Sequence, residues 1–267
     1  MRRALVPACL SALLCLTTAA PALAADPLVA TLDDITAVFE NGANSPQYGY
    51  IENLNDGCGY TAGWIGFCTQ TGDLLKLVER YNQAAPDNVL AKYTDTLRQL
   101  AGSGSDDTSA LGGSFESDWK QAAQDSTFTE LQLATGHELY LNPARDLVAQ
   151  HGLRTNLGLA NFFDTALMMG PGPTDCDGLP KIIGETSSAL GGDPASGVDE
   201  ASWLSRFNQI RAEHMRHPCT PGRENDWPSA TGRTEALQQL ADEGNWALTT
   251  PLTVHGGFEV TITDPHD

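Results

Sequence analysis

The chain has 267 residues, and its 34 acidic against 15 basic side chains give a formal net charge of −19 at pH 7. Such a field repels nucleic acids and anionic membranes and attracts polycations, so neither nucleic acid nor membrane is an expected partner. Acidic composition is also common in soluble secreted proteins and identifies no ligand by itself. The length suits one large domain or two modest lobes with a real core.

The first 24 residues have the composition of a secretory signal peptide. Arg2 and Arg3 precede an apolar run that ends near Leu16, and small residues follow. Cleavage is expected after Ala24. The apolar run is too short to span a bilayer as a stable helix. We therefore predict a secreted, extracellular protein whose residues 25–267 form a single domain.

Apolar residues at helical spacing, from Leu28 to Phe39, predict an amphipathic helix that ends near Glu40. The C-terminal end of a helix carries partial negative charge, which tends to raise the pKa of a carboxyl group placed there. Glu40 is therefore a candidate proton donor at mildly acidic pH. On position alone, a solvated residue at the end of a helix is the plainer interpretation.

Residues 48–54 alternate in the manner of a strand, and the Asp-Gly step at Asp56 is a strong turn signal. Residues 60–67 predict the returning strand. Asp56 and Glu40 thus lie on different elements and can face each other across a gap. Cleavage of a glycosidic bond requires such a pair, one acid to protonate the leaving oxygen and one carboxylate to activate water or attack the sugar. The alternative is that Asp56 only forms the turn of an ordinary hairpin.

Helical periods dominate the rest of the chain, so the predicted fold class is α+β and predominantly α-helical. Aromatic residues at these spacings, such as Trp119 and Phe162, predict core rather than carbohydrate-binding surfaces. Residues 191–198 predict a linker and residues 255–263 a peripheral strand. The predicted helices cover residues 74–81, 88–100, 115–124, 127–140, 143–151, 153–168, 181–190 and 203–211.

Four cysteines follow the signal peptide, Cys58, Cys68, Cys176 and Cys219. Secretion permits disulfides, and four thiols allow three full pairings. Cys68 follows an apolar segment and is alternatively a buried free thiol, whereas a link between Cys176 and Cys219 would join two loop-like segments. No Cys and His spacing is typical of a zinc site.

Asp164 lies within the apolar run ANFFDTALMM, where an unpaired charge would be expensive. We therefore expect this aspartate to have a buried partner.

One long patterned segment stands out, with YGYIENL at residues 48–54 and DGCGYTAGWIGFC at residues 56–68, leading to Asp73. Weaker similarity continues through NVLAKY, DWKQAA, NFFDTALMMGPG and EGNWALTTPL. These segments resemble the family 46 glycoside hydrolases, the secreted chitosanases, over nearly the whole chain after the signal peptide. The resemblance implies a lysozyme-like fold with two helical lobes, a small β-hairpin and a substrate cleft between the lobes.

The resemblance also implies an inverting endo-hydrolysis of β-1,4 bonds between the glucosamine units of chitosan. Glu40 would be the general acid and Asp56 the general base, and Thr61 would hold the attacking water. No metal or organic cofactor is required. Chitosan, a cationic polysaccharide, is then the expected partner of this acidic chain, and we expect a monomer.

Substrate binding is implied for Asn41, Tyr50 and Asp73. Asp73 would recognise the ammonium group of a glucosamine unit through a charge-assisted hydrogen bond. Its place in the first turn of a helix also suits a plain stabilising role.

The family places an aspartate at the position of Asp164 that pairs with arginines behind the catalytic acid. Arg211 matches one of them well, and Arg233 matches the other with the spacing shifted by about one residue. Their role would be to fix the geometry and pKa of the two catalytic carboxylates.

Two positions depart from the family pattern. Cys58 stands where members commonly have Arg, and Met169 stands where they often have His. Both lie in regions expected to contact sugar, so the departures leave substrate length and cut preference open.

Two other functions compete with this interpretation. A muramidase or lytic transglycosylase would share the fold, but peptidoglycan carries lactyl groups and anionic neighbours that suit a negative cleft poorly. A non-catalytic acidic glycan-binding protein would keep the fold and the charge but would not need the pair Glu40 and Asp56.

Overall fold

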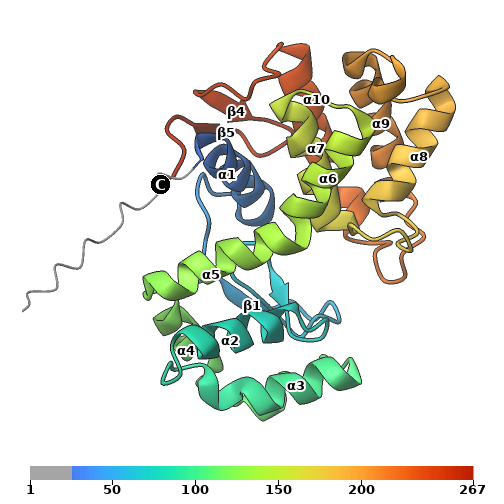
Figure 1. Ribbon diagram of the computed structural model, residues 1–267. Helices are drawn as coiled ribbons and strands as arrows, with labels where there is room; N and C mark the ends of the chain where they lie inside the picture. Colours follow the sequence, from blue (N-terminus) through green and yellow to red (C-terminus); the bar gives the residue numbers. More distant parts are fainter. Residues whose placement is uncertain (1–25, 267) are drawn as a thin grey trace, which may run out of the picture.

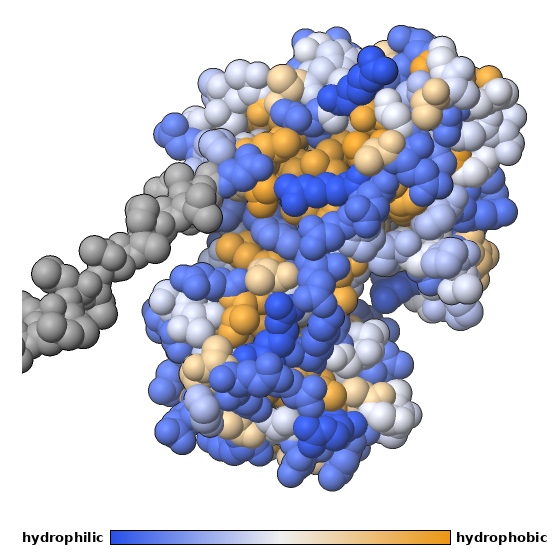
Figure 2. All heavy atoms as spheres, in the orientation of Figure 1, coloured by the Kyte–Doolittle hydropathy of each residue, from blue (hydrophilic) through white to orange (hydrophobic). Residues whose placement is uncertain are grey.

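The computed structural model describes residues 26–266, so the predicted signal peptide lies outside the described residues. The fold is mostly helical with a small antiparallel sheet, as the helical periods predicted, and it is lysozyme-like, as the family resemblance implied. Figure 1 shows one lobe that holds the sheet with α2, α3 and α4, and a second lobe that holds α1 and the helices from α7 onward. Figure 2 shows a mainly hydrophilic face that narrows between the two lobes.

Helix α1 (Pro27–Asn41) belongs to the second lobe. The Asp26 carboxylate caps it by accepting a hydrogen bond from the Leu28 amide, and the chain leaves the helix at Gly42, whose φ of +65° favours glycine. All residues from Ala30 to Phe39 are buried. The prediction of an amphipathic helix is therefore wrong, because the acidic pair Asp33 and Asp34 is enclosed by protein instead of facing solvent.

Three short strands form the sheet, β1 (Ile51–Asn53), β2 (Tyr60–Ala62) and β3 (Phe67–Cys68), paired antiparallel in that order. Glu52 lies opposite Thr61, and Thr61 lies opposite Cys68. The prediction of one returning strand over residues 60–67 is thus corrected to two strands. A tight turn separates them because Gly63 and Gly66 adopt φ values of +74° and +70°, which L side chains rarely adopt.

The first lobe is completed by α2 (Asp73–Ala84), α3 (Thr94–Ser103) and α4 (Phe115–Ala122), with 3-10 turns at Ala91–Tyr93 and Thr108–Leu111. The helix predicted over residues 88–100 begins only at Thr94, after the first of these turns. The core of the first lobe is aromatic, as predicted. Trp119 is fully buried and packs edge-on against Phe128, with ring centroids 5.1 Å apart.

One long helical segment connects the lobes (Figure 1). Helix α5 (Ser126–Gly136) continues through a π-helical turn (His137–Leu141) into α6 (Asn142–His151). The break predicted between residues 140 and 143 is therefore absent. Pro143 has no N–H to donate, and the wider π turn directly before it lets the chain pass this residue without ending the helix.

The second lobe also holds α7 (Asn156–Met169), α8 (Leu179–Leu190), α9 (Glu200–Arg216) and α10 (Gly232–Asp242). Helix α7 lies against α1, α6, α8 and α10, and α9 packs against α8 and α10. Helix α7 starts at Asn156 and not at residue 153, because the Glu200 carboxylate binds the amides of Arg154 and Thr155 before the helix begins. A stacked pair, Trp203 and Phe207, fills the space between α9 and α7. No helix within residues 26–266 is both long and apolar enough to cross a membrane.

Two other predictions for the second lobe need correction. The linker over residues 191–198 contains a 3-10 turn, Pro194–Ser196, and a further 3-10 turn covers Trp227–Ala230. The strand predicted over residues 255–263 is a hairpin of β4 (Leu252–Val254) and β5 (Val260–Ile262). Gly256 and Gly257, both with positive φ, lie in its turn.

Two disulfides form among the described cysteines. Cys176 pairs with Cys219 and joins two loops of the second lobe, as considered from the sequence. Cys58 pairs with Cys68, so the alternative of a buried free thiol at Cys68 is wrong.

A buried glutamine fastens the sheet and the chain before it to the connecting helix. The Gln132 side chain on α5 accepts a hydrogen bond from the Trp64 amide at 3.4 Å and donates to the Tyr48 carbonyl at 3.1 Å. We expect Gln132→Leu to lower the free energy of unfolding by about 1–3 kcal/mol, because it leaves a buried N–H without its acceptor. Urea denaturation measures this, and Gln121→Leu at an exposed position of α4 is the control. Equal effects of the two substitutions would contradict the assignment.

Candidate active site

Glu40 lies in the last turn of α1, and its side chain is 20% exposed. It lines a hollow of about 390 Å³ together with Asn41, Gln47, Gly49 and Tyr50. Glu40 Oε1 accepts a hydrogen bond of 2.7 Å from Arg233 Nη2. The predicted acid is therefore neither a solvated helix end nor enclosed in the core, and one side of its carboxyl group borders open space.

Behind Glu40 lies a buried ion network on three helices. Asp164 on α7 is 2% exposed. Its Oδ2 accepts from Arg211 Nη2 of α9 at 2.5 Å, and its Oδ1 accepts from Arg233 Nε and Nη2 of α10 at 3.1 and 2.5 Å. The Arg233 guanidinium also lies over the Phe39 ring, 5.0 Å from its centroid. The structure thus brings together Glu40, Asp164 and the two arginines.

These contacts shift the pKa values of the network in different directions. Burial raises the pKa of Glu40 above its ordinary value, although the Arg233 guanidinium opposes the shift. Burial would also raise the pKa of Asp164, but the two guanidiniums outweigh it and hold that pKa below its usual range. Glu40 therefore retains its proton to a higher pH than an ordinary glutamate, whereas Asp164 stays ionised.

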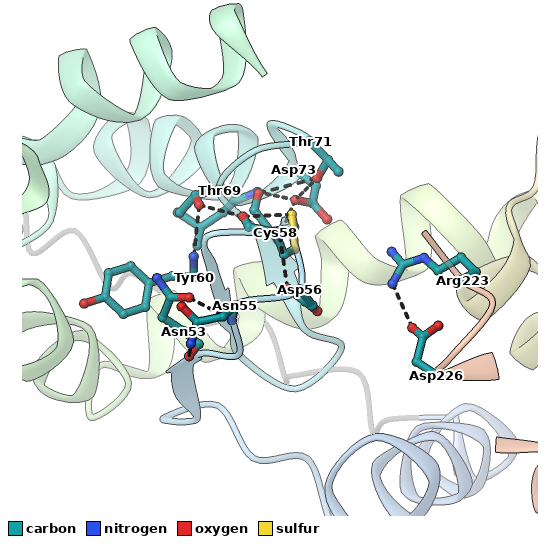
Figure 3. The surroundings of a disulfide bond; sticks show 12 residues. Asn53, Asn55, Asp56, Cys58, Tyr60, Thr69, Thr71, Asp73, Arg223 and Asp226 are labelled. Atoms are coloured by element: carbon teal, nitrogen blue, oxygen red, sulfur yellow. Dashed lines mark hydrogen bonds and ion pairs between the residues drawn. A yellow bond between two sulfur atoms is a disulfide. The ribbon is translucent and has the colours of Figure 1, made fainter. Parts of the chain in front are cut away.

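Asp56 lies in the exposed turn between β1 and β2, in the other lobe. Its Oδ1 accepts a hydrogen bond of 3.1 Å from the Cys58 amide. In Figure 3 the Asp56 side chain lies at the end of the hairpin, on the side that faces Arg223 and Asp226 of the second lobe. The candidate base is thus fixed by its own turn and open to solvent.

Tyr50 is influenced by the charges of both candidate acids, Glu40 and Asp56. Its hydroxyl donates to Glu52 at 3.2 Å. Burial raises the pKa of Tyr50 first, and the carboxylates of Glu52, Asp56 and Glu40 raise it further. The phenol therefore lies within the electrostatic reach of both candidate catalytic groups, one from each lobe. Thr61 is on β2, opposite Glu52 and within the same hairpin as Asp56.

Asp73 begins α2, and all its hydrogen bonds go to Oδ1. This oxygen accepts from the amides of Cys68 and Leu74 at 2.7 and 2.8 Å and from the Thr71 hydroxyl at 2.8 Å. Burial raises the pKa of Asp73 in spite of these bonds. One carboxylate oxygen thus stabilises the start of the helix, as its position in the sequence suggested, and this use does not engage Oδ2.

Two features of the site were not found from the sequence. Tyr140, in the π turn that connects the lobes, has its pKa raised by burial first and then by the carboxylates of Asp73 and Glu40. The Asn41 side-chain oxygen is buried with no hydrogen-bond partner among the described residues. Only the π turn, a feature often found at functional sites, would have pointed to Tyr140, and the sequence does not predict it.

One group of possible metal ligands occurs within residues 26–266, formed by Cys176, Asp177 and Cys219. The two sulfur atoms are joined in a disulfide. The Asp177 carboxylate accepts hydrogen bonds from His214, from the Cys219 amide and from both the amide and the hydroxyl of Thr220. These sulfur and carboxylate atoms are thus already used to hold a loop.

Glu40 borders a hollow of the second lobe, and Asp56 lies in an exposed turn of the first lobe. Enzymes that cleave glycosidic bonds use two carboxyl groups that face the same substrate. The model of glycosyl hydrolase family 46 matches residues 34–252, and the chain belongs to this family of glycoside hydrolases. It is 40% identical over 232 residues to a chitosanase of Bacillus subtilis (strain 168), an alignment that covers 85% of this chain and 83% of the relative.

Solved structures agree with this assignment. A mutant chitosanase from Bacillus subtilis MY002, complexed with 6 GlcN, superposes with a TM-score of 0.84 at 37% identity and covers 90% of this chain and 99% of that one. A family 46 chitosanase from Gynuella sunshinyii, in complex with chitotetraose, gives a TM-score of 0.79 at 38% identity, with 84% and 92% covered.

Loss of the Asp164 carboxylate should strongly destabilise the fold. Asp164→Ala leaves the buried Arg211 guanidinium without its counter-ion and leaves Arg233 with Glu40 alone, and we expect it to lower the free energy of unfolding by about 3–5 kcal/mol. Denaturant titration checks this against Asp95→Ala, which breaks an exposed pair with Arg98 and should cost at most about 1 kcal/mol. A cost as small as that of the control would show that the network does not hold the helices together.

Glu40 should make stability depend on pH in a specific direction. Its pKa in the folded protein lies above 4.5, the ordinary value, so between the two values the unfolded chain has already lost a proton that the folded chain keeps. The contribution of Glu40 to the free energy of unfolding therefore falls as the pH rises through this window. Glu40→Gln removes that slope, so the variant should gain stability relative to the wild type from pH 4 upward.

Urea titrations at several pH values measure this difference. Glu130→Gln, at an exposed carboxylate of α5, is the matched control and should differ from the wild type by a constant amount. A Glu40→Gln difference that is flat or falls with pH would contradict the raised pKa.

Proposed function

We propose that this protein is an endo-acting chitosanase that hydrolyses β-1,4 bonds between glucosamine units with inversion at the anomeric carbon. The relatives that it matches are chitosanases, and two of the similar structures contain oligosaccharides of this class. The net charge of −19 favours a cationic polymer over neutral or anionic glycans. Glu40 carries the proposal most directly, because it is a carboxyl group with a raised pKa at the wall of a hollow.

In the proposed mechanism Glu40 gives its proton to the glycosidic oxygen as the bond to the anomeric carbon breaks. Asp56 takes a proton from a water molecule, and the water oxygen bonds to the anomeric carbon from the opposite face. Thr61, on the strand that follows the Asp56 turn, helps to hold this water. Inverting enzymes of this type separate the two carboxyl groups by roughly 6.5–9.5 Å, which leaves room for the water.

Asp73 is the proposed site for an ammonium group of the substrate. Its three hydrogen bonds leave Oδ2 outside the local capping arrangement. An ionised carboxylate prefers a charged ammonium group to a neutral acetamide, so this contact would favour deacetylated sugar. Asn41 and Tyr50, which line the hollow beside Glu40, are the proposed sugar contacts on either side of the cleavage point.

We also propose that the protein acts outside the cell. The signal-like residues 1–24 support this, and so do the two disulfides, which persist mainly in oxidising compartments. A muramidase or a non-catalytic binder is less well supported, because the relatives that this chain matches over most of their length are chitosanases. Clearing of bacterial cell walls without release of reducing ends from chitosan would favour the muramidase.

Substitution of the two acids tests the mechanism. We expect Glu40→Gln and Asp56→Asn each to lower kcat on chitosan by about 10²–10⁴-fold, because each removes one proton transfer, with KM changed far less. Release of reducing ends measures the rate, and Glu130→Gln is the control. NMR of the first products should show the α-anomer. Early β-anomer would contradict inversion, and wild-type turnover in Glu40→Gln would contradict an enzymatic role for this residue.

A further inference from the structure

A covalent bond ties the turn that carries Asp56 to the rest of the sheet. Cys58, two residues after Asp56, forms a disulfide with Cys68 of β3, and their Cα atoms are 5.4 Å apart. In Figure 3 this disulfide lies between Asp56 and Asp73.

Cys58 also holds Asp56 by a hydrogen bond. Its amide donates to Asp56 Oδ1 at 3.1 Å. Its carbonyl accepts from the Thr69 hydroxyl at 2.9 Å and from the Gln70 amide at 3.1 Å. The peptide groups on either side of Cys58 therefore fix the carboxylate on one side and attach to the segment after β3 on the other. A shift of Cys58 would move Asp56 with it.

Besides these contacts of Cys58, the turn is held by hydrogen bonds from Asn55 to Asn53. Residues 54–57 are exposed, and Leu54 keeps 47% of its surface in solvent. Asn55, Gly57 and Gly59 all have positive φ values, of +55°, +89° and +76°. Glycine loses more conformational freedom than any other residue when it is ordered, so a turn of this composition gains most from a cross-link that limits its alternatives.

The other end of the disulfide leads to Asp73. The Cys68 amide donates to Asp73 Oδ1 at 2.7 Å. One cross-link therefore connects the proposed base to the proposed ammonium-binding carboxylate through hydrogen bonds of its two half-cystine residues.

We propose that the Cys58–Cys68 disulfide is a positioning device for base catalysis and makes turnover depend on the oxidation state of these two cysteines. This inference rests on the proposed function, in which Asp56 is the base. A dithiol supplies two electrons and two protons, which convert the disulfide into two thiols while the dithiol becomes a cyclic disulfide. The freed turn then samples positions in which the carboxylate no longer meets the water, and a misplacement of about 1 Å can cost on the order of 10²-fold in rate.

Paired serine variants test the positioning role. We expect Cys58→Ser with Cys68→Ser to lower kcat on chitosan at least tenfold, with KM within twofold, at a temperature well below its melting point. The matched control is Cys176→Ser with Cys219→Ser, which removes the other disulfide and should keep wild-type kcat. Equal losses in both double variants would show a merely structural role, and full activity of the first double variant would overturn the inference.

A second measurement does not depend on the folding of the first double variant. The control variant keeps Cys58–Cys68 as its one disulfide among residues 26–266, so titration with dithiothreitol can be followed by thiol alkylation at Cys58 and Cys68. Turnover should fall in step with thiol release and return on reoxidation. Turnover that stays constant after full reduction would overturn the inference.

Asp56→Asn separates this inference from the proposed function on which it rests. Wild-type kcat in Asp56→Asn would contradict the proposed function itself. An inactive Asp56→Asn together with full activity of the enzyme that lacks Cys58–Cys68 would overturn only the positioning role.

Discussion

The structure depends on one buried charge, the carboxylate of Asp164, held between the guanidiniums of Arg211 and Arg233. Three helices, α7, α9 and α10, meet at this point, and a fourth joins them because Arg233 also binds Glu40 of α1. Buried ion pairs are rarely the cheapest way to stabilise a core, since removing charges from water costs several kcal/mol per ion. A hydrophobic core could hold the same helices. What it could not supply is a fixed positive group beside the carboxyl group that faces the hollow.

The network meets two opposing demands that the proposed role of Glu40 as general acid would impose. The acid must keep its proton until the substrate is bound, and its anion must be stable once the proton has left. Burial meets the first demand by raising the pKa of Glu40. Arg233 meets the second, because its guanidinium lies 2.7 Å from the carboxylate that proton transfer creates. Asp164 neutralises part of the positive charge and so prevents two arginines from abolishing the raised pKa. With all four groups ionised, the network is electrically balanced.

Local patterns predicted much of the fold, and failed where a distant contact decided the structure. The helical period from Leu28 to Phe39 located α1, but its acidic residues suggested solvent on one face. The structure buries Asp33 against His137 and Asp34 against His266, partners more than 100 positions away in the chain that no period reveals. The expectation of a buried partner for Asp164 followed from the cost of an unpaired charge. The choice of Arg211 and Arg233 came from family resemblance and not from the residues alone.

The gap between the two candidate acids is set by the connecting helix, because both walls are attached to it at the π turn. His137 in that turn binds Asp33 of α1 with Nε2 to carboxylate distances of 2.8 and 2.9 Å. The same imidazole packs edge-on against Trp64, with centroids 6.0 Å apart, and Trp64 lies in the turn between β2 and β3. A single side chain therefore touches both the helix that ends in Glu40 and the sheet whose first turn carries Asp56. A π turn shifts the side chains that follow relative to a regular helix, so its position directly fixes where His137 and Tyr140 lie. The connecting helix thus attaches to both lobes through His137, and its geometry bears on the separation of the proposed acid and base.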